Sequence, residues 1–214
     1  MADIFQEVDE EVRRDKALAL WKKYGSYVAI ACLAVVLGTA ARVGWREYKT
    51  AQRNEESGRF VAAAKLLEQG DTVSAITSFQ SLGAEANTGY GLIAGFQEAA
   101  ARANSGDVDG AVAAFDAIAN DGGADEVFRN LAQLQAVMVL IDAGPAEDIN
   151  QRLQPLLTPN GPWRHSAQEL QAVLQQREGD LEGARTSFKT LSEDATAPAG
   201  IRARAGQMLA ALGG

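Results

Sequence analysis

The chain has 214 residues, with 20 Lys and Arg against 28 Asp and Glu, and a formal net charge of −8. Past Arg53 there are 11 basic and 21 acidic side chains, so a nucleic-acid partner is not expected, because phosphate binding needs clustered Lys and Arg. The single cysteine, Cys32, and the single histidine, His165, exclude a disulfide within the chain, a zinc-thiolate cluster and a metal site of several imidazoles.

Residues 1–23 form a tail in which acidic and basic side chains alternate. Apolar residues recur in this tail at helical spacing, which favours a short amphipathic helix near a membrane surface. They are Ile4, Phe5, Val8 and Val12. Two roles stay open for the tail: a docking segment for a cytoplasmic protein, or a solvated terminus that only sets the topology.

The stretch Tyr24–Ala41 contains no charged side chain and lies between Lys23 and Arg42. As a helix its 18 residues would rise ~27 Å, close to the hydrocarbon core of about 30 Å. If Arg42 snorkels outward, the span continues to Trp45. We therefore predict one transmembrane helix over residues 24–45. Aromatic side chains, which favour membrane interfaces, lie at both ends: Trp21, Tyr24, Tyr27, Trp45 and Tyr48.

Three other interpretations of this stretch are weaker. A cleaved signal peptide would have a shorter apolar core and fewer than the 23 residues that precede it here. A lipoprotein signal ending at Cys32 would be followed by polar residues, but the sequence stays apolar for nine positions. A buried soluble helix suits a run of about 10–14 apolar residues better. Charge leaves the orientation open, because five Lys and Arg precede the stretch and five follow it within twenty residues.

Residues 46–69 lack proline and carry apolar residues at helical spacing, so the membrane helix should either run on or restart as the first helix of a C-terminal domain, residues 46–214. From there the sequence repeats every 35 to 38 residues, in segments that begin at Gly70, Gly106, Gly144 and Gly179. Apolar residues 5, 9 and 12 positions after each glycine share one helix face. They are Ala75, Phe79, Leu82, Ala111, Phe115, Ile118, Ile149, Leu153, Leu156, Ala184, Phe188 and Leu191.

Each repeat glycine is expected to end one helix in the left-handed conformation, and the next residue to start another. Asp71, Asp107 and Asp180 would cap the new helices with their side chains, and Pro145 would begin the third. Longer helical patterns lie between these segments, over residues 90–105, 127–143, 163–178 and 198–212. The predicted fold class is therefore all-α: one transmembrane helix, an α-solenoid of about four stacked helix pairs, and a capping helix at the C-terminus.

Catalytic chemistry finds little support. His165 lies at a helix start beside Trp163 and Arg164, and we interpret these residues as packing the junction between the third and fourth pairs. Glycine-rich phosphate loops are absent from the sequence, so we predict no enzyme, no cofactor and no metal site. Protein binding is expected instead, on the first helix of each pair, where polar side chains would face a concave surface. These candidates are Gln97, Arg102, Arg129, Gln133, Arg164, Gln168 and Gln171.

Two levels of resemblance carry further expectations. The G-D-x-x-x-A-x-x-x-F pattern resembles the second half of a tetratricopeptide repeat, whereas the first halves lack most of the large residues of that repeat. Further motifs are MADIFQEVDEEVRRDK at the start, WKKYG before the span, GRF at 58–60, PWRHSAQEL at 162–170 and PAGIRARAGQML near the end. With these motifs the chain resembles the YfgM-type family of ancillary SecYEG-translocon subunits, in a form similar to alphaproteobacterial members.

This resemblance implies a cytoplasmic N-terminal tail, one inner-membrane helix and a periplasmic repeat domain. It also implies the partners, namely Sec translocon subunits, periplasmic chaperones and emerging secreted chains, beside membrane lipid and without a small-molecule substrate. The expected function is a scaffold that assists Sec-dependent translocation by tethering, since anchoring raises effective concentration. The alternative is a membrane anchor for a cytoplasmic stress-response regulator that binds the N-terminal tail.

Overall fold

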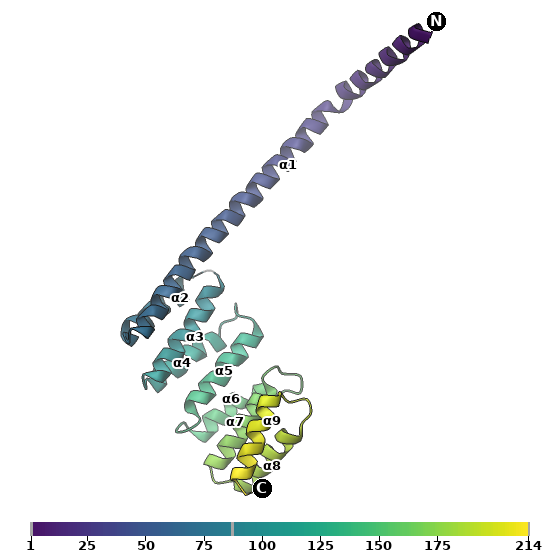
Figure 1. The fold of residues 1–214 in the computed structure, drawn as a ribbon. Helices are drawn as coiled ribbons and strands as arrows, with labels where there is room; N and C mark the ends of the chain where they lie inside the picture. Colours follow the sequence, from purple (N-terminus) through teal and green to yellow (C-terminus); the bar gives the residue numbers. More distant parts are fainter. Residues whose placement is uncertain (1, 87, 214) are drawn as a thin grey trace. The chain divides into compact units, whose positions relative to one another are not determined.

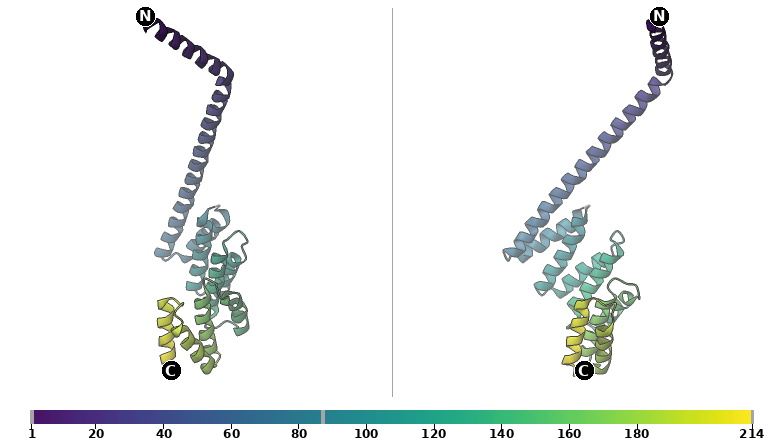
Figure 2. Two further views of the ribbon diagram at one scale, coloured as in Figure 1. Left: turned by 90° about the vertical axis from the view of Figure 1, so that its right-hand side faces the viewer. Right: turned by 45° about the vertical axis from the view of Figure 1, so that its right-hand side comes forward.

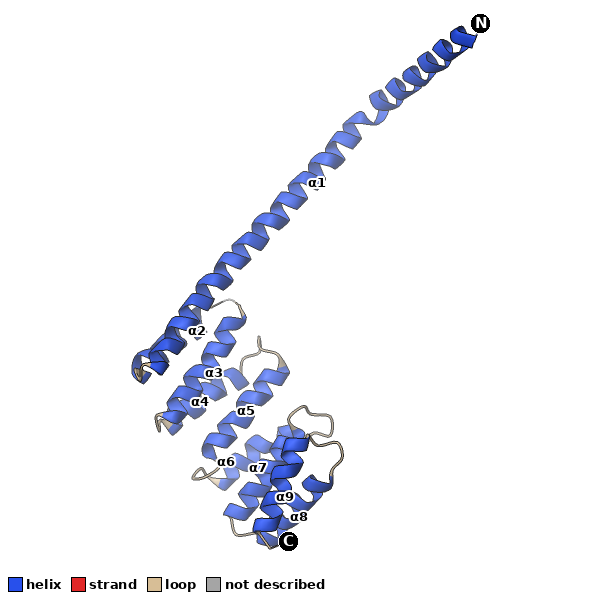
Figure 3. Cartoon of the chain, viewed as in Figure 1, coloured by secondary structure: helices blue, strands red, loops and turns tan. Residues whose placement is uncertain are grey.

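The computed structural model describes residues 2–86 and 88–213, without the side chains of residues 2–12, 15 and 17. All regular structure in these residues is helical, which confirms the predicted fold class (Figures 1 and 3). The helices are α1 (Ala2–Glu68), α2 (Thr72–Glu85), α3 (Gly89–Asn104), α4 (Val108–Ala119), α5 (Glu126–Leu140), α6 (Ala146–Leu153), η1 (Gln154–Leu157, a 3-10 turn), α7 (Arg164–Arg177), α8 (Leu181–Glu193) and α9 (Ala199–Ala211).

The chain divides into two units, Met1–Asn54 and Glu55–Gly214, which we call the N-terminal unit and the C-terminal unit. Helix α1 forms the described part of the N-terminal unit, and its last turns, from Glu55 to Glu68, belong to the C-terminal unit. The tail is therefore helical, as expected. The apolar tail residues that would make it amphipathic, Ile4, Phe5, Val8 and Val12, lie outside the described side chains.

The apolar stretch of α1 has the surface of a membrane span. Every large apolar side chain from Val28 to Leu37 is exposed, and the helix is long and apolar enough to cross a membrane. The Thr39 hydroxyl donates a 2.8 Å hydrogen bond to the Val35 carbonyl, so this polar group is satisfied within the helix, as a lipid environment requires. A soluble core helix would instead bury these side chains.

The C-terminal unit is a stack of helices that pack on their neighbours in chain order (Figure 2). All twelve apolar repeat residues are buried, which confirms the predicted helix face. All of them except Ala111 belong to four separate clusters along the stack. Each cluster contains one large residue nine positions after a repeat glycine: Phe79, Phe115, Leu153 or Phe188. A series of small cores is the arrangement of a repeat protein, in which each pair contacts its neighbours.

Three of the four repeat glycines end a helix as predicted. Gly70, Gly106 and Gly179 have φ values of 81°, 84° and 84°. In the first repeat, Gly70 N donates to Leu67 O at 3.0 Å and Asp71 N donates to Leu66 O at 2.9 Å, the two bonds of a Schellman motif. The aspartates then cap the following helices: the side chains of Asp71, Asp107 and Asp180 accept the backbone N–H of Ser74, Gly110 and Gly183.

The expectation for the remaining repeat glycine, Gly144 of the third repeat, was wrong. Positive φ among the described glycines occurs at residues 70, 106, 179 and 213, and Gly144 N donates to Leu140 O at 2.7 Å. Pro145 follows Gly144, has no N–H for the second bond of a Schellman motif, and disfavours a helical conformation at the residue before it. In the same repeat Pro155 ends regular α-helix, since α6 stops at Leu153 and η1 follows.

Candidate partner-binding site

Six of the seven polar residues expected to bind partners occupy matching positions in the repeats. Counted back from the repeat glycines, they lie 15, 11, 8 or 4 residues earlier, which is one stripe of the first helix of each pair. They are Arg102 on α3, Arg129 and Gln133 on α5, and Arg164, Gln168 and Gln171 on α7. The seventh, Gln97, lies nine residues before Gly106, about 130° from this stripe at 3.6 residues per turn.

The structure gives these residues different surroundings. Gln97 is exposed, whereas the other six are half-buried. Arg102 bonds within the fold: it donates to Glu98 at 3.0 Å and to Asp107 at 3.1 Å. Partial burial disfavours the charged guanidinium, but these hydrogen bonds outweigh it and raise the pKa of Arg102. Arg102 is therefore a fixed charge of the α3–α4 junction.

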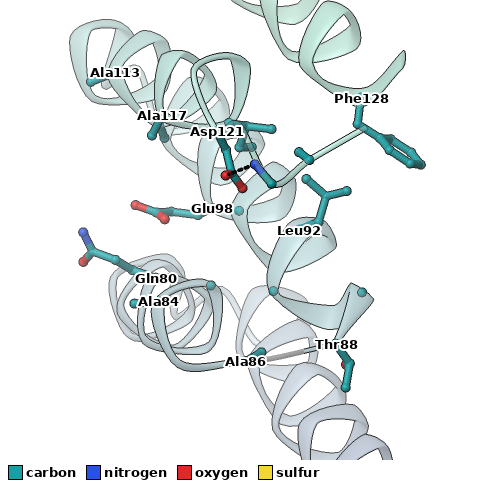
Figure 4. A pocket seen from close by; sticks show the side chains of 18 of the residues that line it. Gln80, Ala84, Ala86, Thr88, Leu92, Glu98, Ala113, Ala117, Asp121 and Phe128 are labelled. Carbon is teal, nitrogen blue, oxygen red and sulfur yellow. Dashed lines mark hydrogen bonds between the residues drawn. The ribbon is translucent and has the colours of Figure 1, made fainter. Parts of the chain in front are cut away.

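Of the seven, Arg102 alone lines the groove that runs along α3. The groove has a volume of about 980 Å³, and its floor is the α3 stripe of Gly91, Gly95, Glu98 and Arg102. Figure 4 shows the two walls on either side of Glu98: one from α2 and one from α4. The labelled wall residues are Gln80 and Ala84 on α2, and Ala113 and Ala117 on α4.

Glycines on α3 let this floor lie deep between its neighbours. A Cβ atom at Gly95 would lie 3.3 Å from Cδ1 of Ile118, and one at Gly91 would lie 3.2 Å from the Ala86 carbonyl oxygen. Both distances are shorter than ordinary contacts, so a side chain at either position would displace its neighbour by a few tenths of an ångström. Close packing of the backbone thus forms the floor of the groove.

The groove carries more negative than positive charge. Glu98 has only 12% of its side chain exposed and is paired with Arg102. Asp121 accepts the Gly123 N–H at 2.8 Å, and Asp125 begins α5 without a side-chain capping bond. Neither Asp121 nor Asp125 has an ion-pair partner among the described residues. Two of the three lining carboxylates therefore face solvent without a protein cation.

The residues around His165 form a structural cluster. His165 Nε2 lies 3.3 Å from Asp194 Oδ2, 3.2 Å from Thr196 Oγ1 and 2.8 Å from Arg164 Nη2. In a Ser-His-Asp triad the acid and the nucleophile bond different ring nitrogens, whereas Asp194 and Thr196 both approach Nε2. Hydrogen bonds from the side chain and backbone of Thr196 lower the pKa of Asp194. The cluster ties the start of α7 to the loop before α9.

The sequence pattern predicts a different junction for these residues, the one between the third and fourth pairs. Trp163 does join the third and fourth pairs, because its Nε1 donates to the Val127 carbonyl at 2.9 Å. Arg164 and His165 instead contact residues 194–196, between the fourth pair and α9. Among the described residues, no three His, Cys, Asp or Glu side chains come together as metal ligands would.

A comparison with known families gives one match. The family model described as a tetratricopeptide repeat-like domain matches residues 19–209, which is most of the chain. Neither the curated proteins nor the solved structures give a match. The family match therefore agrees with the repeat period, the helix pairs and the buried face described above.

Proposed function

Because this chain belongs to the tetratricopeptide repeat-like domain family, we propose that it is a membrane-anchored scaffold that binds other proteins through its C-terminal unit. The observation that carries the proposal is one exposed apolar helix segment in the same chain as a stack of helix pairs. Repeat stacks of this kind present extended surfaces to proteins, and a membrane anchor raises the effective concentration of whatever they bind.

The finer part of the proposal concerns place and partners. We propose a cytoplasmic tail (residues 1–23), a bacterial inner-membrane span (residues 24–45) and a periplasmic repeat domain (residues 46–214). The partners would be Sec translocon subunits, periplasmic chaperones and emerging secreted chains. Support for the partners comes from the resemblance to ancillary translocon subunits, which covers nearly the full length of the chain. Support for the span comes from aromatic and basic side chains at both of its ends, with Lys23 over Tyr24 and Lys49 over Trp45.

Co-purification from mild detergent tests this function. The tagged full-length protein should enrich translocon subunits or periplasmic chaperones in mass spectrometry, and a variant that lacks residues 46–214 should not. The reason is that the contacts would come from the repeat stack, while the span alone supplies only the anchor. Equal enrichment by both proteins would contradict binding through the C-terminal domain.

A second candidate function rests on the tail, where acidic and basic residues alternate on the helix that precedes the span. This tail would anchor a cytoplasmic stress-response regulator at the membrane. A variant that lacks residues 2–20 separates the two functions in the same experiment. Loss of a cytoplasmic regulator from this variant, with its retention by the protein lacking residues 46–214, would favour the anchor over the scaffold.

A further inference from the structure

We propose that the groove along α3 binds a partner segment in which one bulky apolar side chain lies between Lys or Arg residues. The inference rests on the proposed protein-binding function and adds to it the binding face and the chemistry of the partner. Its evidence is the set of residues that form the floor, the walls and the charge of the groove.

At Gly95 the floor lacks a large side chain that the repeat pattern would supply. A tetratricopeptide repeat has the spacing W-x-x-L-G-x-x-Y in its first helix, with three large residues around a small one. Ala99 is the fully buried small residue of α3, and with it in the glycine position the three large positions hold Gly95, Glu98 and Arg102. All three line the groove. The groove is thus open where a large side chain of the chain itself would otherwise lie.

The walls and the rim suit an apolar side chain from another molecule. The α4 wall presents the methyl groups of Ala113 and Ala117, both exposed, and Ile118 closes the inner side. Phe128 stands at the rim with 40% of its surface exposed. An aromatic or branched side chain entering here would replace water by apolar contacts on three sides, as anchor residues do at protein interfaces. The volume of about 980 Å³ is within the range of ligand clefts.

The negative charge of the groove favours Lys or Arg beside the apolar anchor residue of the partner segment. Glu98 is already neutralised by Arg102, whereas Asp121 and Asp125 have no cation partner among the described residues. Lys or Arg next to the anchor would meet these two carboxylates, and an acidic segment would be repelled. The exposed face of α3 that carries Ile93 and Gln97 is a different surface, because neither residue lines the groove.

Fluorescence anisotropy with full-length protein in nonionic detergent tests the inference. The probe is a labelled peptide with a Trp-Leu pair between two Lys-Lys pairs. It should bind the native protein and the Ile93→Trp variant alike, because Ile93 is exposed and does not line the groove. It should bind Ala117→Trp at least about tenfold more weakly, because a new indole fills the groove from its wall. A peptide in which Ser-Ser replaces Trp-Leu should also bind the native protein about tenfold more weakly than the probe does.

A second variant tests the inference even if Ala117→Trp does not fold. Asp121→Asn with Asp125→Asn removes both unpaired charges and keeps amides that can accept the same backbone bonds. This double substitution should weaken binding of the basic peptide by about twofold to fivefold for each charge removed. It should have little effect on binding of a neutral Trp-Leu peptide. The inference is overturned if the native protein does not bind the probe, if the Ser-Ser peptide binds equally, or if Ile93→Trp rather than the groove variants abolishes binding. If co-purification still depends on residues 46–214 in that case, the proposed scaffold function stands and only the proposed binding groove is rejected.

Discussion

Replacing Phe188 by alanine is expected to lower the free energy of unfolding of the C-terminal unit by about 3–5 kcal/mol. Phe188 is completely buried in the last core cluster, between α7, α8 and α9, with Ala184, Leu191 and Ile201. Truncation removes the largest apolar side chain of that cluster and leaves a cavity that helices held by neighbouring repeats cannot fully close. Urea denaturation in detergent, followed by circular dichroism, measures the change.

The matched control is Phe128→Ala, which makes the same truncation at a side chain that is 40% exposed. This control should lower the free energy of unfolding by less than about 1 kcal/mol, since exposed positions tolerate substitution. Equal losses for the two variants would contradict the division of the C-terminal unit into small cores built on the repeat positions.

Placing two arginines in the apolar stretch should prevent stable membrane insertion. In the Leu33→Arg/Leu37→Arg variant both charges lie near the middle of residues 24–45, where each costs about 2.5–3.5 kcal/mol on insertion scales. Leu33 and Leu37 are exposed on the helix surface, so neither substitution disturbs a protein core. We expect the variant to leave the membrane fraction on alkaline extraction and gradient flotation.

Val61→Arg serves as the control, because Val61 is an exposed apolar residue of the C-terminal unit. It should float with the membranes as the native protein does. If the double variant also stays with the membranes while its helix is intact, residues 24–45 are not the anchor.

The repeat architecture could be read from the sequence because its signals are local. A Gly-Asp step sets both a helix end and the next helix start within a few residues, and the apolar positions follow at fixed offsets. All twelve of these positions are buried. Gly144 shows the limit of such a pattern: one neighbour, Pro145, removes the N–H on which the left-handed cap depends, and the glycine takes another conformation.

The groove was harder to predict from the sequence, because it depends on side chains that α3 lacks where it packs against α2 and α4. Six of the seven polar residues predicted from the sequence share the helix stripe that forms the floor of the groove in α3, but of these residues only Arg102 lines the groove. The signal was in the same helix: Gly95 holds a position where the repeat pattern calls for a large side chain, and Gly91 lies one turn before it on that stripe. Whether such a gap is filled depends on side chains about 20 residues away, such as Ile118, which local sequence does not reveal.

Site-specific photocrosslinking in intact cells tests the central claim, protein binding by the C-terminal unit, most directly. A photoreactive amino acid would be placed at exposed positions 97, 117 and 203 of this unit, and at position 10 of the tail. The account predicts crosslinks to a translocon subunit or a periplasmic chaperone from the C-terminal unit, strongest at position 117 in the wall of the groove. Crosslinks to a cytoplasmic protein from position 10, with none from the three positions of the C-terminal unit, would contradict it.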